Sequence, residues 1–411
     1  MLSHGILAAL APGLVAASRL YITSYGGKFD TTNVTVTGGV STVDLPAGLA
    51  AERCEQTETQ VLTSLAKSDA CGPTPSWLTH VGDILYCTDE GFTTTNTALV
   101  SLKTESTGSL VLMDKNTAVI GGPVSSVLFG NGKALAIPGY AAGGITTHNI
   151  SDPNALTLMQ NITFTLPPGG SGLGSQGQPR AHQTILDPTG NFLLVPDLGS
   201  DLVRIFSTNN GTLQIAEAGA ISLPRGSGPR HGVFVKGTTK TFFYVVTELT
   251  NNVFGYEVTY GTDKTISFVQ VHASNTHGEP VGSALPNTTV AAEISLSPDS
   301  NFIVVSSRLE ASLTIPHPDP SNSTMIQSDP LITFSIQKDT GKLAHLQTKA
   351  MGGINPRHFS FNGNGTLVAA VSQNSNRVTV IARDPTNGLL GDIIATIEDI
   401  GEPNFVIFDD A

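Results

Sequence analysis

The sequence predicts an all-β fold, a seven-bladed β-propeller, and three observations support this prediction. A degenerate unit recurs along the chain with a period of roughly 50 residues, which is typical of repeat architectures. Runs such as residues 241–249 and 301–308 are rich in β-branched and aromatic residues, as strands are. The 411 residues include 43 Gly and 24 Pro but only 13% charged residues, which indicates many turns between short strands. Length alone suggests several domains, whereas a propeller arranges all its blades around one axis.

Each copy of the repeat begins with Pro or a small residue, followed by a short strand, a turn and a second apolar strand. Further apolar runs such as 202–206 and 378–382 follow the hairpins, so we expect four strands in a blade. Turns such as 187–191 are rich in the Pro, Gly, Asn and Asp residues that turns require. The copies lie at residues 74–91, 122–140, 178–206, 228–258, 291–313 and 355–381, and a seventh start lies at 402–408.

The seventh start ends the chain, and no second strand follows it. A matching second strand is present at the other end of the sequence, in residues 19–27. Pairing the C-terminal strand with the N-terminal strand closes a ring and leaves no open sheet edge. We therefore expect residues 19–411 to form one propeller of seven blades.

The N-terminus has the pattern of a secretory signal. Residues 5–15 form a short apolar run, and small residues precede Ser18, although no Lys or Arg precedes the run. The run is too short to span a bilayer. We predict a signal peptide at residues 1–18 and a secreted, extracellular or cell-wall glycoprotein. Glycosylation is expected at the N-x-S/T sequons, Asn33, Asn149, Asn161, Asn210, Asn287, Asn322 and Asn364.

Charge and cysteine content limit the partners. The net charge of −12 argues against binding to nucleic acid or to an anionic membrane, but a local pair of arginines can still bind a small anion. Cys54 and Cys71 flank a polar stretch, and we expect them to form a disulfide. Cys87 lies in a predicted core strand and is expected to be a buried thiol. No Cys/His spacing suggests zinc, and we expect neither a metal nor another cofactor.

The repeat places polar residues at one end of the blades. His182 and Arg230 lie near the start of the first strand of their copies, and Glu248 and Arg308 end the second strand of theirs. In an antiparallel hairpin the start of one strand lies beside the end of its partner, so these side chains can meet at one mouth of the central tunnel. The same reasoning nominates Tyr25, Glu90, Tyr140, Asp197, Gln373, Trp77, Glu293, Arg357 and His358. We expect His231 and His358, which follow Arg in the two P-R-H sequences, to pack between blades.

Three stretches carry a family resemblance: P-R-A-H-Q at 179–183, G-P-R-H-G-V-F at 228–234 with V-V-T-E-L at 245–249, and 291–308. There the chain resembles the lactonase propellers, which include bacterial 6-phosphogluconolactonase and fungal carboxy-cis,cis-muconate cyclase. The resemblance covers nearly the whole mature chain. It implies a catalytic set of one His, one Glu and two Arg, which correspond here to His182, Glu248, Arg230 and Arg308. The family's metabolic roles are intracellular, so the predicted export puts the substrate in doubt.

These residue types suit acid–base chemistry on a lactone. Paired arginines can bind a carboxylate and stabilise charge that develops on a carbonyl or enolate oxygen, while His and Glu exchange protons. The sequence thus favours an enzyme that cyclises or hydrolyses a small carboxylated lactone, without deciding which of His182 and Glu248 is the acid. One alternative is a non-catalytic secreted glycoprotein or adhesin, and another is a cyclase or isomerase of a specialised metabolite. Expected substrate contacts are Arg230, Arg308, Arg357, Tyr25, Tyr140 and Gln373.

Overall fold

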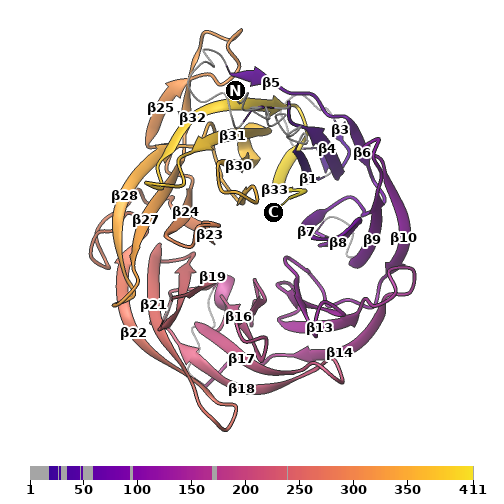
Figure 1. The fold of residues 1–411 in the computed structure, drawn as a ribbon, viewed down its shortest axis with the longest axis vertical. Coiled ribbons are helices and arrows are strands. Elements are labelled where there is room, and N and C mark those ends of the chain that lie inside the picture. Colours follow the sequence, from indigo (N-terminus) through magenta and orange to yellow (C-terminus); the bar gives the residue numbers. More distant parts are fainter. Residues whose placement is uncertain are drawn as a thin grey trace, which may run out of the picture.

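The computed structural model is a ring of seven β-sheets around a central axis, which confirms the predicted fold class (Figure 1). It describes residues 18–410 except 26, 29–34, 47, 50–58, 93–95, 169–173 and 238. The predicted signal peptide therefore lies outside the described residues, apart from Ser18. In the described part of the chain, no helix is long and apolar enough to cross a membrane.

Six blades are built from consecutive stretches of the chain, each with four antiparallel strands. From the axis outwards, blade 1 contains β7 (Pro75–Val81), β8 (Ile84–Asp89), β9 (Ala98–Thr104) and β10 (Leu110–Asn116), and blade 2 contains β11 (Val127–Phe129), β12 (Ala134–Gly139), β13 (Gly144–Asn149) and β14 (Thr157–Thr163). Blade 3 contains β15 (Ile185–Leu186), β16 (Phe192–Asp197), β17 (Leu202–Asn209) and β18 (Gln214–Ser222), and blade 4 contains β19 (Pro229–Lys236), β20 (Thr241–Thr247), β21 (Asn252–Tyr260) and β22 (Ile266–Asn275). Blade 5 contains β23 (Val290–Leu296), β24 (Phe302–Arg308), β27 (Pro330–Gln337) and β28 (Lys342–Ala350), and blade 6 contains β29 (Phe359–Phe361), β30 (Leu367–Ser372), β31 (Arg377–Arg383) and β32 (Leu390–Glu398).

Blade 7 joins the two ends of the chain, as the sequence predicts. Its innermost strand is the C-terminal β33 (Glu402–Phe408), followed by β1 (Arg19–Tyr25), β4 (Gly39–Asp44) and β6 (Ala66–Ser68). β33 and β1 lie side by side (Figure 1) and run antiparallel. Leu20 lies opposite Phe408, and Ile22 lies opposite Val406. The ring is thereby closed by backbone hydrogen bonds rather than by side chains alone.

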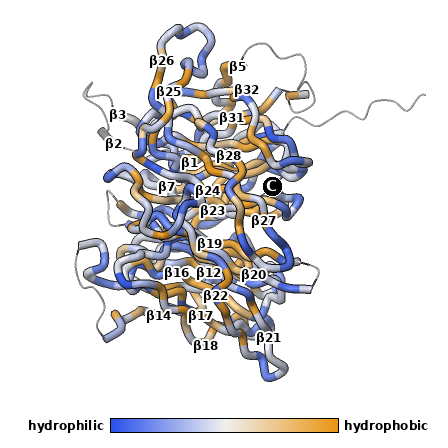
Figure 2. Tube along the Cα trace, turned by 90° about the vertical axis from the view of Figure 1, so that its left-hand side faces the viewer, coloured by the Kyte–Doolittle hydropathy of each residue, from blue (hydrophilic) through white to orange (hydrophobic). Residues whose placement is uncertain are grey.

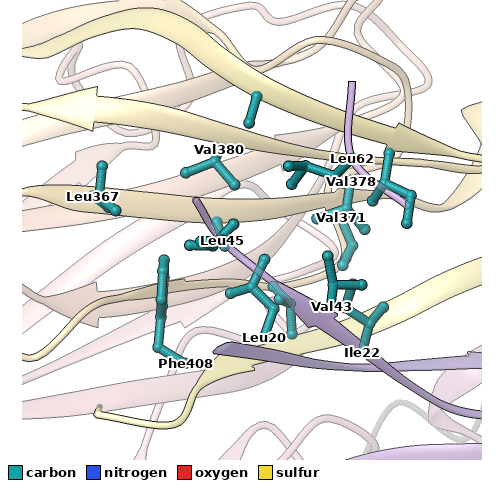
Figure 3. Close-up of a cluster of buried hydrophobic side chains, with 14 of the residues drawn as sticks. Leu20, Ile22, Val43, Leu45, Leu62, Leu367, Val371, Val378, Val380 and Phe408 are labelled. Atoms are coloured by element: carbon teal, nitrogen blue, oxygen red, sulfur yellow. The ribbon is translucent and has the colours of Figure 1, made fainter. Parts of the chain in front are cut away.

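The core lies between neighbouring blades, because alternate side chains of each strand point to opposite faces of its sheet. Figure 3 shows one such layer, where Leu20, Ile22 and Phe408 of blade 7 pack against Val371 and Val380 of blade 6. All five side chains are almost completely buried. Closure of the ring is therefore also a hydrophobic contact between the first and the last strands of the chain and blade 6.

Shorter elements decorate the ring. β5 (Gln60–Val61) extends the outer edge of blade 6 in parallel to β32. The hairpins of β2 (Gly27–Lys28) with β3 (Thr35–Val36) and of β25 (Leu313–Pro316) with β26 (Met325–Ser328) stand apart from the blades, as the side view in Figure 2 shows. Two single turns of 3₁₀ helix, η1 (Gly174–Gln176) and η2 (Gln373–Ser375), precede β15 and follow β30.

The predicted disulfide between Cys54 and Cys71 is wrong in one of its two cysteines, because Cys71 has another partner. Cys71 bonds Cys87, with 6.0 Å between their Cα atoms, and both residues are completely buried. Cys71 precedes the innermost strand of blade 1 and Cys87 lies within the next strand, so folding of the blade brings them together. Cys54, the partner expected for Cys71, lies outside the described residues. Cys87 is therefore not the free thiol that its strand position suggested.

Candidate active site

The innermost strands β7, β19 and β23 carry β-bulges near their starts. The pairing register shifts between Pro75 and Trp77 in β7, between Pro229 and His231 in β19, and between Ala291 and Ile294 in β23. A bulge breaks the alternation of a strand and re-aims its side chains. Two successive residues of an inner strand can then both face the tunnel. We call the first of them the mouth layer, Ser76, Val124, His182, Arg230, Arg357 and Asn404, and the second the plug layer, Trp77, His231, Glu293, His358 and Phe405.

Glu248 joins two arginines from two blades at the mouth. Its Oε2 lies 2.8 Å from Nε of Arg230 and 3.0 Å from Nη2 of Arg308. The guanidinium groups also donate to backbone carbonyls of β23, Arg230 to Ala292 at 2.8 Å and Arg308 to Ala291 at 3.1 Å. Burial alone would raise the pKa of Glu248, but Arg308, Arg230 and Arg357 outweigh it and hold this pKa below its usual value. The carboxylate is therefore ionised at neutral pH and fixes both arginines.

Arg357 is the third arginine of the mouth, and it is only weakly paired. Its nearest carboxylate is Glu90, at 3.7 Å, and its guanidinium lies 5.5 Å from the centre of the Tyr25 ring. Glu90 instead accepts a hydrogen bond of 2.6 Å from the Tyr25 hydroxyl. Among the described residues, the Arg357 side chain makes no hydrogen bond. It is therefore the mouth cation best placed to bind a ligand.

The mouth carries an excess of positive charge although the whole chain is acidic. Three arginines, Arg230, Arg308 and Arg357, face two carboxylates, Glu90 and Glu248. The chain as a whole has a net charge of −12. In the described part of the chain, no group of three His, Cys, Asp or Glu side chains is arranged to hold a metal ion. The excess of guanidinium groups over carboxylates at the mouth suits a small anion.

His182 lies beside the arginines and is 6% exposed. Its Nδ1 is 3.0 Å from Nε2 of His231, and the edge of its ring meets the Tyr140 ring at 5.5 Å between centres. Arg180 covers Tyr140, with its guanidinium 4.8 Å from the ring centre. Burial, and then the charge of Arg230, lower the pKa of His182 well below its ordinary value. At neutral pH its imidazole is therefore uncharged and able to accept a proton.

The plug layer fills the tunnel below the mouth. Trp77 packs against Phe405 and His358 with ring centres 4.4 and 5.2 Å apart, and His358 stacks on Phe405 at 4.0 Å. The cavity left between the two layers measures only about 10 Å³. The expectation that His231 and His358 pack between blades is therefore wrong, because both rings line the tunnel, His231 at the bulge of β19 and His358 just before β29.

The other nominated residues divide into two groups. Tyr25, Glu90 and Tyr140 lie at the mouth with the arginines, and Glu293 lies in the plug layer. Gln373 bonds Glu402 at 3.4 Å and Asn355 at 3.3 Å instead of reaching this cluster. Asp197 is completely buried, pairs with Arg204 at 2.9 Å and accepts from the backbone of Arg180 at 2.7 Å, so it holds a loop.

The sequence did not reveal two features of the site, the contact of Arg180 with Tyr140 and the bonded series His182–His231–Glu293. For the second a signal existed. The Glu of A-A-E at 291–293 occupies the same place after its bulge as the His of P-R-H at 229–231. Both residues therefore belong to one tunnel layer.

Comparison with known proteins places this geometry in a family. A family model described as "Lactonase, 7-bladed beta-propeller" matches residues 25–408. The chain belongs to the lactonase seven-bladed β-propeller family. A probable 6-phosphogluconolactonase of Arthroderma benhamiae is 32% identical over 318 residues, which is 77% of this chain and 75% of the relative. The 6-phosphogluconolactonase of Formosa agariphila is 25% identical over 316 residues, 75% of this chain and 80% of the relative. The resemblance found in the motifs is confirmed.

Solved structures agree with the lactonase fold. The periplasmic gluconolactonase of Pseudomonas aeruginosa superposes with a TM-score of 0.76 at 21% identity, covering 96% of this chain and 99% of that one. A protein from Lactobacillus plantarum gives a TM-score of 0.73 at 22% identity, covering 95% of this chain and 99% of that one. At these identities the similarity establishes the fold alone. Both structures support the seven-bladed ring.

Proposed function

We propose that this lactonase-family chain hydrolyses a small anionic lactone at the tunnel mouth. The observation that carries the proposal is the cluster of Arg230, Arg308 and Arg357, which outnumbers its carboxylates in an acidic protein. An anionic group on the substrate is the natural partner of the weakly paired Arg357. The names of the relatives favour a phosphorylated sugar lactone, and a carboxylated lactone offers the same charge.

In this proposal the residues of the mouth carry out each part of lactone hydrolysis. His182 takes a proton from water as the oxygen of that water forms a bond to the lactone carbonyl carbon. The carbonyl oxygen gains negative charge, which Arg230 and Arg308 stabilise from positions fixed by Glu248. The bond from that carbon to the ring oxygen then breaks, and the ring oxygen receives the proton. The product is an open-chain hydroxy acid.

Cyclisation of a muconate-type acid would use the same groups in a different reaction, which neither consumes nor releases water. A carboxylate oxygen would add to a double bond, and a proton would go to the adjacent carbon. Arg230 and Arg308 suit that carboxylate as well as they suit a developing oxyanion. We place hydrolysis first because the named relatives are 6-phosphogluconolactonases.

Turnover of a substrate panel tests the proposal. Acid release is followed with a phosphorylated, a carboxylated and a neutral sugar lactone, and ring closure with a carboxymuconate. We expect the anionic lactones to be hydrolysed faster than the neutral one, and His182→Ala to lower kcat by at least about 100-fold. If the muconate is the only compound turned over, the reaction is cyclisation and the proposal of hydrolysis is wrong. Folded protein without turnover of any compound would contradict an enzyme and favour a binding scaffold.

We also propose that the protein is exported and glycosylated. Most sequon asparagines of the described residues are exposed, namely Asn161, Asn210, Asn287, Asn322 and Asn364. Asn149 is partly buried, and Asn33 lies outside the described residues. The Cys71–Cys87 disulfide also suits an oxidising compartment.

Expression of the full chain in a eukaryotic host tests export. We expect protein in the medium that begins near Arg19 and loses mass on treatment with a glycosidase. Retention in the cell without glycans would contradict export.

A further inference from the structure

Three buried side chains of successive blades form a continuous hydrogen-bonded series behind the mouth. Nδ1 of His182 lies 3.0 Å from Nε2 of His231, and Nδ1 of His231 lies 2.9 Å from Oε2 of Glu293. These three residues are 6%, 2% and 3% exposed. The other oxygen of Glu293, Oε1, accepts the backbone N–H of Ile294 at 3.0 Å. One carboxylate oxygen is thus anchored, and the second is directed at His231.

With both rings neutral, the series admits only two arrangements of protons, because each imidazole nitrogen in it must donate or accept. When Glu293 is ionised, His231 donates from Nδ1 and accepts at Nε2, so His182 donates from Nδ1 and its Nε2 is bare. When Glu293 is protonated, every bond reverses and His182 carries its proton on Nε2. The two arrangements differ by one proton in total.

We propose that His182, His231 and Glu293 are a proton relay, in which a proton taken by His182 from the attacking water is stored on Glu293. This inference rests on the proposed lactone hydrolysis. A proton binds Nε2 of His182 while the Nδ1 proton of His182 moves to Nε2 of His231. The Nδ1 proton of His231 then moves to Oε2 of Glu293. Reversal returns one proton to Nε2 of His182, which delivers it to the leaving ring oxygen.

The surrounding charges favour storage on the carboxyl group rather than on an imidazolium. On the mouth side, Arg230, Arg357 and Arg308 face His182, and Tyr140 covers its ring edge. Burial, together with these arginines, lowers the pKa values of His182 and His231.

The surroundings of Glu293 instead favour the protonated, neutral form of its side chain. Burial raises the pKa of Glu293, although His358 at 3.6 Å and Arg230 oppose this rise. When the proton is held by Glu293, the carboxyl group is neutral, and no fourth positive charge is added beside the three arginines. His231 and Glu293 therefore act through His182 as positioning residues.

The relay also leads towards the far end of the tunnel. A cavity of about 540 Å³ lies on the other side of the plug layer, lined by turn residues such as Pro298 and Asn362. Glu293 and His358 belong to its lining. A substrate that covers the mouth would thus leave Glu293 in contact with a second space through which its proton can exchange.

Two measurements test the relay separately from the function. In kinetics with the best lactone, we expect Glu293→Gln to lower kcat by roughly 100-fold with KM changed less than about twofold. Removing the negative charge also lowers the proton affinity of the series, so the acidic limb of the pH–rate profile should move to lower pH. His231→Gln, which keeps Glu293, should lower kcat similarly. Ser360 lines the same far cavity without touching the series. Ser360→Ala is therefore the control, and we expect it to behave as the wild type. An unchanged kcat and pH profile in Glu293→Gln would overturn the relay.

Nitrogen-15 NMR of histidine-labelled wild-type protein needs no substrate. Resonances are assigned by their loss in His182→Gln and His231→Gln. We expect both rings to be neutral and protonated on Nδ1 at pH 7, which leaves Nε2 of His182 free to take a proton. Both rings protonated on Nε2, opposite tautomers, or an imidazolium in either ring would overturn the relay. Absence of any turnover by folded wild-type protein would instead overturn the proposed function. The NMR measurement would still test the hydrogen-bonded series, because it does not depend on turnover.

Discussion

Nε of Arg230 lies 2.8 Å from Oε2 of Glu248, across the first hairpin of blade 4. The same oxygen contacts Arg308 of blade 5 at 3.0 Å, so one carboxylate holds cations from two blades in a single geometry. Preorganised charges of this kind stabilise a developing oxyanion without rearranging during the reaction. The pair therefore links the blade structure directly to the proposed chemistry.

Glu248→Gln should release the two arginines from their common partner. We expect kcat/KM for an anionic lactone to fall about 100-fold, because small displacements of charged groups have effects of this size. Steady-state kinetics measures the loss. Glu257→Gln is the matched control, since Glu257 pairs with Lys240 at 2.9 Å on the outer part of the same blade. Equal activity of the two variants would rule out a role for Glu248 at the site.

Arg357→Gln should weaken binding of the substrate anion. A hydrogen bond to a charged group contributes about 1.5–3 kcal/mol, so KM for an anionic lactone should rise by about 10-fold or more. The neutral lactone serves as the internal control, and its KM should hardly change. If KM rises equally for both lactones, Arg357 supports the mouth instead of binding the anion.

Replacement of both Cys71 and Cys87 by Ser should destabilise blade 1. A disulfide that closes a loop of this length, with a sequence separation of 16, contributes up to about 3 kcal/mol. Thermal unfolding should show a lower Tm, whereas Cys54→Ser should leave Tm unchanged. A non-reduced peptide map that joins Cys54 to Cys71 would contradict the structure.

Phe408→Ala should weaken the closure of the ring. Phe408 is completely buried beside Leu20 in the core between blades 7 and 6 (Figure 3). Truncation of a buried Phe typically costs about 3–5 kcal/mol, so chemical denaturation should detect a large loss of stability. Val111→Ala, at an exposed position of β10, is the control and should change stability little. Similar stability of the two variants would show that closure does not depend on this contact.

Acidification should destabilise the fold through its buried histidines. Burial lowers the pKa values of His148, His272 and His358 to about 4. Unfolded histidines bind protons below about pH 6.5, whereas these folded ones do so only near their lowered values, so acid favours the unfolded state. The free energy of unfolding should be greatest above pH 6.5 and fall as the pH is lowered towards 4.

Tm measured between pH 7.5 and 4.5 tests this dependence. His148→Gln, which removes one of the three groups, should make the decline shallower. A constant Tm over this range would contradict the account.

The order of the blades, and the end of the ring that carries the polar residues, could be predicted from the sequence because both depend on the path of the backbone alone. Residues 402–408 need a partner strand, and residues 19–27 are the only unpaired match in the repeat pattern. His182, Arg230, Glu248 and Arg308 could be assigned to one end of the ring because hairpin geometry fixes which strand ends are neighbours.

The details that the sequence did not predict depend on where side chains point. The two P-R-H sequences contain no sign of the bulge that turns His231 into the tunnel. The choice of Cys87 over Cys54 as the partner of Cys71 depends on the distance between two strands of a folded blade. The matching places of P-R-H at 229–231 and A-A-E at 291–293 indicate a shared layer, but the bond of His231 to Glu293 joins two blades and neither local pattern specifies it.

A crystal structure with a non-hydrolysable lactam analogue of a phosphorylated sugar lactone tests whether the mouth is the active site. We predict that its phosphate binds Arg357 and that its carbonyl oxygen points to Arg230 and Arg308, with His182 facing the carbonyl carbon. Binding in the far cavity beyond the plug layer, or no binding at concentrations that saturate an active lactonase, would contradict the assignment of the mouth as the active site.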